Sequence, residues 1–318
     1  MEINKNFFQN ITALNAKQIT FIIIAIFTLS PFSSPALSLF LGILSTFLIP
    51  KVFNNLNKIS KYLLQISVVG LGFGMNINNA IKVSQDGFWL TFIFIFGTLA
   101  LGLIFGKIFK LQDKTATLIT SGTAICGGSA IAAVSPVIEA ENEDISVAMG
   151  IVFLLNSIAL LIFPILGHYF GLSQYQFGLW SAIAIHDTSS VVGAAQSYGS
   201  DALKIATTIK LARALWIIPL TVLFAFLYKK KGKLSSFPKF ILFFIVAMAV
   251  NTYFPIIEPL SVVLVSLAKN GLNLTLFLIG AGLSLENIRK VGFRSILFGL
   301  LLWIIILTSS LLVVINFY

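Results

Sequence analysis

The chain has 318 residues, of which 58% are hydrophobic and 10% are charged, and its mean hydropathy is +0.98. A soluble domain carries about 25% charged residues, so this composition excludes an ordinary water-facing globular protein. The net charge is +10, which in a membrane protein marks the cytoplasmic ends of helices rather than a nucleic-acid partner. The single cysteine excludes a disulfide scaffold.

Apolar segments follow one another along the whole chain, and a spanning helix needs about 20 apolar residues. We therefore predict an all-α polytopic membrane protein with about eleven transmembrane helices in a single transmembrane domain, residues 1–318. If every segment crosses once and the N-terminus is cytoplasmic, most Lys and Arg residues fall on the inside, which favours an outer C-terminus. The acidic run at 139–144 then lies outside. The predicted segments are 18–31, 35–50, 61–77, 88–107, 115–138, 145–167, 174–198, 202–228, 238–254, 259–285 and 292–316.

The chain also resembles itself in two places. Residues 72–83 align without gaps on residues 280–291, seven segments later, so the two copies are expected in opposite orientations. Inverted repeats of this kind are typical of secondary transporters, and the boundary between the halves is predicted near 170–175. A second similarity, of 124–131 to 184–191, has an offset of two segments, which fits a duplication only if a segment is re-entrant.

The segment at 115–138 carries three glycines and a proline, namely Gly122, Gly127, Gly128 and Pro136. These residues are costly inside a helix and predict a broken helix that lines a cavity. The free N–H groups of the half-helix after the break would suit an anion. Close helix packing through small residues is the alternative. The predicted substrate-binding residues here are Thr123, Gly127, Gly128 and Ser129.

The segment at 174–198 places polar groups near the middle of an apolar stretch. Such residues are expensive in hydrocarbon and indicate function, although hydrogen bonding between helices is the alternative. We predict that His186 or Asp187 couples transport to a proton or to sodium. The predicted substrate ligands beside them are Thr188, Ser189 and Ser190.

Two basic residues of the next segment, Lys210 and Arg213, are three residues apart and share one helix face. Arg offers a planar fork for oxyanions, so both are predicted to supply positive charge to an anion. A structural ion pair with Asp187 is the alternative. Asn156 and Lys269 are weaker candidates for the same cavity; for Lys269 the alternative is a place near the outer interface. We predict no metal site, no cofactor and no enzymatic activity, since no zinc-ligand spacing and no dinucleotide fingerprint occurs.

The motifs at 122–138 and 185–195 together resemble the YeiH-type family of proposed sulfate exporters, which is related to the superfamily of cation:proton antiporters and anion transporters. The resemblance implies two inverted repeats, a core of broken crossing helices, a panel that forms a homodimer, and a place in the bacterial inner membrane.

These features together predict a secondary active transporter of a small inorganic or organic anion, such as sulfate or a sulfur-containing acid. The anion would lie near the bilayer midplane, between residues 123–129 and 186–190. The alternative is a cation:proton antiporter on the same fold, with Asp187 as the carrier. A membrane enzyme that uses His186 and Asp187 lacks a third catalytic group in the sequence.

Overall fold

The computed structural model describes residues 16–30, 32–48, 56–228, 239–282 and 292–318. Every regular element within these ranges is a helix, as predicted. The first elements are α2 (Ala16–Thr28), α3 (Pro35–Leu48), α4 (Leu56–Gly72), α5 (Ile77–Asp86) and α6 (Phe88–Ile108). The middle elements are α7 (Asp113–Ala124), α8 (Gly128–Val134), α9 (Asn142–Tyr169), α10 (Gln174–Ala184) and α11 (Thr188–Tyr198). The last elements are α12 (Ser200–Ala214), α13 (Ile217–Leu227), α14 (Lys239–Tyr253), the 3-10 helix η1 (Pro255–Ile257), α15 (Glu258–Ala281) and α17 (Phe293–Phe317).

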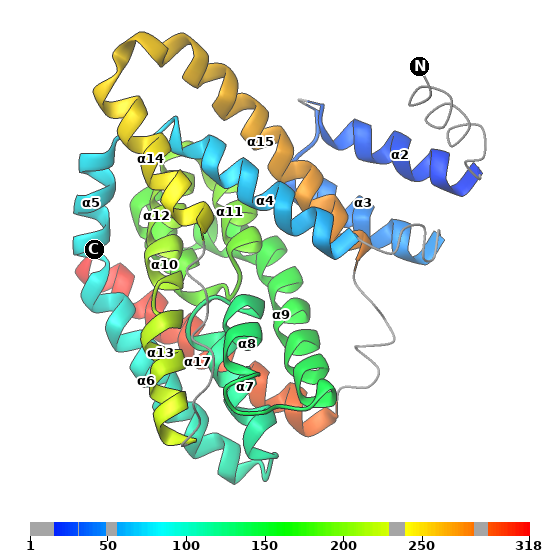
Figure 1. The fold of residues 1–318 in the computed structure, drawn as a ribbon, viewed down its shortest axis with the longest axis vertical. Helices are drawn as coiled ribbons and strands as arrows, with labels where there is room; N and C mark the ends of the chain where they lie inside the picture. The colour runs from blue at the N-terminus through cyan, green and yellow to red at the C-terminus, as the bar shows by residue number, and fades with distance from the viewer. Residues whose placement is uncertain (1–15, 31, 49–55, 229–238, 283–291) are drawn as a thin grey trace.

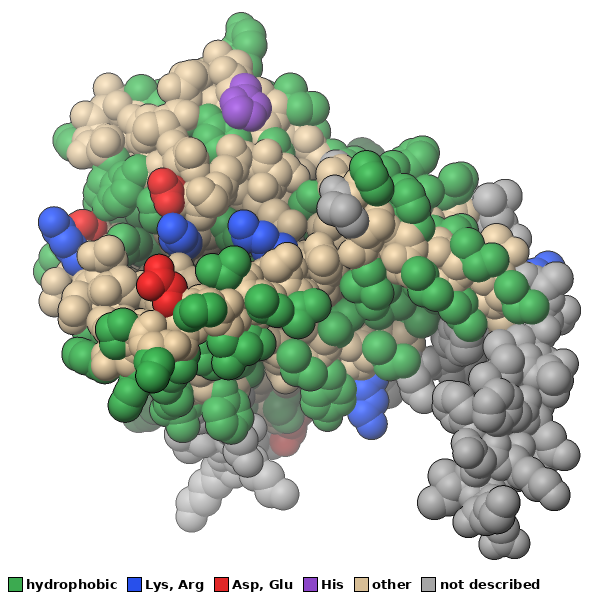
Figure 2. All heavy atoms as spheres, turned by 90° about the horizontal axis from the view of Figure 1, so that it is seen from above, with side chains coloured by type: hydrophobic (Ala, Val, Ile, Leu, Met, Phe, Trp, Pro, Cys, Tyr) green, Lys and Arg blue, Asp and Glu red, His purple; other side chains and the backbone are tan. Residues whose placement is uncertain are grey.

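Five helices of the described chain are long and apolar enough to cross a membrane by length and composition. Each predicted apolar segment coincides with one helix or with two consecutive helices. The surface seen in Figure 2 carries many hydrophobic side chains and few charged ones, the rest of the described surface being backbone and other side chains. This exterior suits lipid rather than water. The five long helices are Phe88–Ile108, Glu143–Tyr169, Ser200–Leu227, Pro255–Ala281 and Phe293–Phe317.

Helices α7 and α8 form a hairpin whose two ends lie together at the start of α9. The hydroxyl of Thr115 donates a hydrogen bond to Oδ1 of Asp144, and Nζ of Lys114 donates to the carbonyl of Glu139 at 2.7 Å. The chain therefore returns to the end of the molecule at which it entered. We call residues 113–140 hairpin 1.

Helices α10 and α11 form a second hairpin, whose ends lie together at the other end of α9. The hydroxyl of Tyr198 donates to the carbonyl of Leu172 at 2.5 Å, and its ring stacks on Phe177 with centroids 3.8 Å apart. A Cβ on Gly167 of α9 would lie within 2.8 Å of both rings. We call residues 173–199 hairpin 2. Because α9 has 28 residues and is about 42 Å long, the two hairpins enter from opposite ends of the molecule.

The structure differs from a single crossing for segments 115–138 and 174–198, because each of them folds back so that its two ends lie together. The break predicted in 115–138 is confirmed, and a second break, which only the family resemblance implied, separates α10 from α11. The four arms have 12, 7, 11 and 11 residues. Glu139, in the acidic run expected outside, accepts a hydrogen bond at its carbonyl from Lys114, one of the basic residues expected inside, so these two residues lie at the same end of the molecule.

Helices α3, α4 and α15 lie side by side along one edge of the molecule (Figure 1), and we call them the slab. Small residues let α4 and α15 approach closely: a Cβ on Gly70 would lie 2.9 Å from that of Ala268, and one on Gly271 would lie 2.4 Å from the hydroxyl of Ser67. This register is antiparallel, as an inverted repeat of 72–83 and 280–291 requires. Residues 283–291 of the second copy lie outside the described residues, and the repeat stays a prediction.

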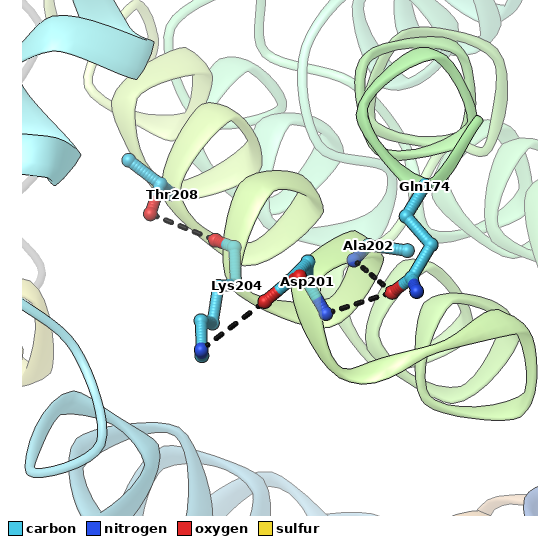
Figure 3. A network of polar contacts seen from close by, with 5 residues as sticks. All are labelled: Gln174, Asp201, Ala202, Lys204 and Thr208. Atoms are coloured by element: carbon cyan, nitrogen blue, oxygen red, sulfur yellow. Dashed lines mark hydrogen bonds and ion pairs between the residues drawn. The ribbon is translucent and has the colours of Figure 1, made fainter.

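The side chain of Gln174 ties the start of α10 to the start of α12, as Figure 3 shows. Its Oε1 accepts hydrogen bonds from the backbone N–H groups of Asp201 at 2.9 Å and of Ala202 at 3.2 Å. The first N–H groups of a helix lack partners within it, so Gln174 acts as a cap supplied from another helix. Lys204 of the same network pairs with Asp201 at 3.2 Å on the exposed face.

Gln174→Ala is expected to lower the free energy of unfolding by about 1 kcal/mol, because loss of a helix cap costs about 0.5–2 kcal/mol. Thermal unfolding in detergent measures the change. Lys204→Ala is the matched control in the same network, since an exposed ion pair contributes about 0–1 kcal/mol. Equal effects of the two substitutions would contradict a capping role for Gln174.

Candidate functional site

The tip of hairpin 1 depends on Gly127. This residue has φ +66° and ψ −127°, a conformation that side chains other than hydrogen rarely adopt. A Cβ at this position would lie 3.1 Å from Cγ1 of Val152 and 3.2 Å from Cβ of Asp187. The tips of the two hairpins therefore meet in the interior, at Gly127 and Asp187.

The tip of hairpin 2 is a helix start capped by its own carboxylate. Asp187 is the N-cap of α11: its Oδ1 accepts a hydrogen bond from the N–H of Ser190 at 3.0 Å, and its Oδ2 accepts one from the hydroxyl of Ser189 at 2.5 Å. The sequence Asp-Thr-Ser-Ser therefore starts a helix here through ordinary N-cap chemistry. Asp187 and Thr188 are half-buried, whereas Ser189 and Ser190 are buried.

Asn156 of α9 holds the same tip from the other side. Its Oδ1 accepts hydrogen bonds from the backbone N–H groups of His186 at 3.1 Å and of Asp187 at 3.3 Å. Both N–H groups belong to the break between α10 and α11, where no helical partner exists. The structure thus brings Asn156 into the predicted site.

Arg213 of α12 lies between the two tips and joins them. Its Nε and Nη2 donate to the carbonyl of Ala124 at 2.9 and 2.5 Å, at the end of α7. Its Nη1 donates to the carbonyls of Ile183 at 2.6 Å and of Ala182 at 3.3 Å, near the end of α10. These are carbonyls that a helix end leaves without partners, and a cation there complements the helix dipole.

Lys210 caps the end of α10 in the same way, with Nζ donating to the carbonyls of Ile185 at 2.6 Å and of Ala182 at 3.2 Å. Lys210 and Arg213 are each 0% exposed. Within the described ranges neither lies within 4.0 Å of a carboxylate oxygen. Arg213 and Asp187 therefore do not form the ion pair that was the alternative. The tips contain two buried cationic side chains, Lys210 and Arg213, and the carboxylate of Asp187.

Several buried polar atoms at the tips have no hydrogen-bond partner in the described part of the chain. They are Oγ1 of Thr123, Nδ2 of Asn156, and both ring nitrogens of His186, whose side chain is 1% exposed. Buried polar atoms normally have a partner, so these atoms are available to a bound ligand or water. Of the remaining candidates, Gly128 is half-buried, Ser129 is exposed, and Lys269 lies in α15, away from the tips.

Sequence reasoning missed Trp303 of α17. Its Nε1 donates to the carbonyl of Ala184, the last residue of α10, at 3.0 Å. The signal was present: a Trp in the middle of an apolar helix has one N–H group that needs a partner. Lys210, Arg213 and Trp303 together satisfy the carbonyl end of α10.

Gly127→Ala is expected to lower the free energy of unfolding by about 1–3 kcal/mol, the cost of a backbone conformation that suits glycine alone. It also pushes the tips apart, so ligand binding at the tips is expected to weaken. Thermal unfolding with and without ligand measures both effects. The matched control is Gly97→Ala on α6, where an added Cβ meets nothing within 4 Å; a Gly127 variant as stable as this control would contradict the tight contact between the tips.

The apolar exterior, the long helices and the two opposed hairpins define a multi-pass membrane protein. Residues 19–299 match the family described as Conserved hypothetical protein 698. UPF0324 membrane proteins of Porphyromonas gingivalis and Bacteroides thetaiotaomicron are 53% and 50% identical to this chain, over 88% and 89% of its length and 88% and 86% of theirs. One from Vibrio parahaemolyticus is 45% identical over 94% of this chain and 98% of its own.

The chain belongs to the UPF0324 membrane protein family. These bacterial relatives are named as membrane proteins, and their names state no substrate. No solved structure matches the chain.

Proposed function

We propose that the protein is a secondary active transporter of a small anion, and that the anion binds between the tips of the two hairpins. The observation that carries this proposal is the charge at the tips, where Lys210 and Arg213 are fully buried and form no ion pair with the described residues. Burying a charge without a counter-charge is costly. A bound anion would balance the excess positive charge.

The polar atoms left open at the tips fit an oxyanion. The Nδ2 of Asn156 and the hydroxyl of Thr123 are donors, and the imidazole of His186 donates from one nitrogen or from both when protonated. Together with the resemblance to proposed sulfate exporters, this chemistry supports sulfate, sulfite or a sulfonate as the first substrates to test. His186 is the group we assign to a coupled proton, because Asp187 is engaged as a helix cap.

The topology that we propose has nine crossings and two re-entrant hairpins, since two of the eleven apolar segments return to the side they enter. This leaves the cytoplasmic N-terminus and outer C-terminus unchanged and places residues 107–114 and 139–144 together inside. Tyr318 at the C-terminus and Tyr175 at the start of hairpin 2 both donate to Asp86, which supports one common, outer side for these three residues. The proposed location is the bacterial inner membrane, as a homodimer with lipid around it and without a cofactor.

A cation:proton antiporter would need Asp187 free to bind a cation. Both of its carboxylate oxygens instead accept hydrogen bonds from Ser189 and Ser190 of its own helix. A cation would also meet the field of two buried positive charges. These two observations favour an anion as the substrate.

A ligand screen on the purified protein in detergent, over pH 5–9, tests the proposal. A ligand that binds the folded state alone stabilises it by RT ln(1 + [L]/Kd), which is about 2.7 kcal/mol at a hundredfold excess over Kd. We expect stabilisation by sulfate, sulfite or a sulfonate, followed by flux of the same anion in proteoliposomes. Stabilisation by sodium or lithium alone, abolished by Asp187→Asn, would overturn the anion assignment.

A further inference from the structure

Among the ionisable side chains at the hairpin tips, that of His186 makes no hydrogen bond within the described part of the chain. Its imidazole is 1% exposed, and Nδ1 and Nε2 both lack a partner. The others are engaged: Lys210 and Arg213 donate to backbone carbonyls, Asp187 caps α11, and the thiol of Cys126 is hydrogen-bonded to the backbone. His186 is therefore the ionisable group that stays free to take a proton and to meet a ligand.

The protein offers a protonated imidazole at this place no compensation. The charged side chains that act on it are Lys210 and Arg213, both cationic. From α9 it meets the uncharged Asn156, and from α17 it meets Trp303, whose ring centroid lies 6.5 Å away. A cation–π contact requires about 6 Å or less. A protonated His186 would thus be a third buried cation without a counter-charge, which is costly.

An anion at the tips supplies the missing counter-charge. An imidazolium donates from both ring nitrogens, and its hydrogen bonds to an oxyanion are charge-assisted and strong. The other partnerless donors at the tips, the hydroxyl of Thr123 and Nδ2 of Asn156, carry no charge. If a bound anion favours protonation of His186, a proton on His186 favours binding of the anion by the same factor.

We propose, on the basis of the transport function proposed above, that His186 takes up a proton only together with the anion, so that one proton and one anion cross the membrane in the same direction. Neither binds well alone. The proton alone would create a third buried cation, and the anion alone would lack a charged donor. The empty and the doubly loaded tips are therefore the favourable states, which is the condition for coupled transport without a leak of either ion.

Isothermal titration calorimetry of the full-length protein with sulfate tests this coupling, in two buffers with different heats of ionisation. Sulfate does not titrate near neutral pH, so any proton that is taken up goes to the protein. We expect uptake of about one proton per sulfate ion bound. We also expect the Kd for sulfate to fall about tenfold for each unit by which the pH falls around neutrality, since the proton favours binding.

His186→Gln removes the titrating group and breaks no hydrogen bond of that side chain in the described structure. We expect it to bind sulfate more weakly, without pH dependence and without proton uptake. The matched control is His168→Gln, which removes the other histidine, an exposed residue at the end of α9 that stacks on Tyr198. This control is expected to keep both the proton uptake and the pH dependence of the wild type.

Flux in proteoliposomes gives the direction of coupling. With the membrane potential clamped, an acidic exterior is expected to drive accumulation of sulfate by the wild type and by His168→Gln, but not by His186→Gln. Release of a proton on sulfate binding, with accumulation driven by an acidic interior, would indicate exchange of the two ions and overturn the symport.

Coupling and anion binding fail separately in these measurements. Sulfate binding without pH dependence and without proton uptake by the wild type would overturn the coupling and leave the anion site standing. Proton uptake that persists in His186→Gln would assign the proton to another group, such as Lys210, and overturn the role of His186. If neither sulfate nor a sulfonate binds at any pH, the proposed function is wrong, and the coupling with it.

Discussion

Arg213→Gln is expected to lower the free energy of unfolding by at least about 3 kcal/mol and to abolish anion binding at the tips. The guanidinium satisfies carbonyls at the ends of two different half-helices, those of Ala124 and Ile183. Each buried carbonyl left without a partner costs about 1–3 kcal/mol. The single amide group of a Gln side chain cannot reach the ends of both half-helices. The measurement is thermal unfolding in detergent, with and without sulfate.

Two further variants separate charge from geometry at this position. Arg213→Lys keeps the charge but loses the planar fork, so we expect a smaller loss of stability and partial anion binding. Arg294→Gln, at an exposed arginine of α17, controls for the change in net charge and is expected to leave both quantities unchanged. An Arg213→Gln protein with wild-type stability would show that the contacts to Ala124 and Ile183 do not hold the tips together.

Asn156→Asp is expected to keep the fold and to lower anion affinity by tenfold or more, a change of about 1.4 kcal/mol. The new carboxylate still accepts hydrogen bonds from the N–H groups of His186 and Asp187, as Oδ1 of Asn156 does. It adds a negative charge at the break between α10 and α11, next to the carbonyls that Lys210 and Arg213 cap, and so reduces the excess of positive charge that favours an anion. Sulfate titration followed by thermal shift measures the loss.

Asn156→Leu is the matched structural control, because it has similar volume but cannot accept a hydrogen bond. It leaves two buried N–H groups unpaired, and we expect it to lose about 2–4 kcal/mol of folding stability. Asn156→Asp is expected to be much more stable than Asn156→Leu. A gain of sodium binding in Asn156→Asp, with sulfate binding unchanged, would instead support the antiporter.

The break in 115–138 is predicted from its glycines, whereas the break in 174–198 is not predicted from its residues, although both have a local cause. Gly127 requires a positive φ, and Asp187 followed by Thr-Ser-Ser is a helix start. The direction of the chain after each break is not local. Segments of this length match a spanning helix by hydropathy, and only distant contacts, such as those of Thr115 with Asp144 and of Tyr198 with Leu172, show that they turn back.

One feature of the sequence did indicate that these segments fold back. The sequence alignment of residues 124–131 with 184–191 pairs positions that are equivalent in the structure. Ala124 and Ala184 each end a half-helix, and Gly127 and Asp187 each precede the next half-helix. Their offset of two segments fits a duplication only if a segment folds back, and the structure contains two such hairpins. The partners of Arg213 could not be predicted, because pattern analysis sees side chains and not the backbone carbonyls that a broken helix exposes.

The bridge made by Arg213 also limits how the molecule can move. Parting the hairpin tips would strand a guanidinium and several carbonyls in an apolar interior, so both hairpins and α12 are coupled mechanically into one rigid core. Alternating exposure of a bound ion to the two sides would then come from displacement of this core against the slab of α3, α4 and α15. The seam between those two bodies, along α11 and α15, is where distance changes between paired spectroscopic labels are expected to be largest.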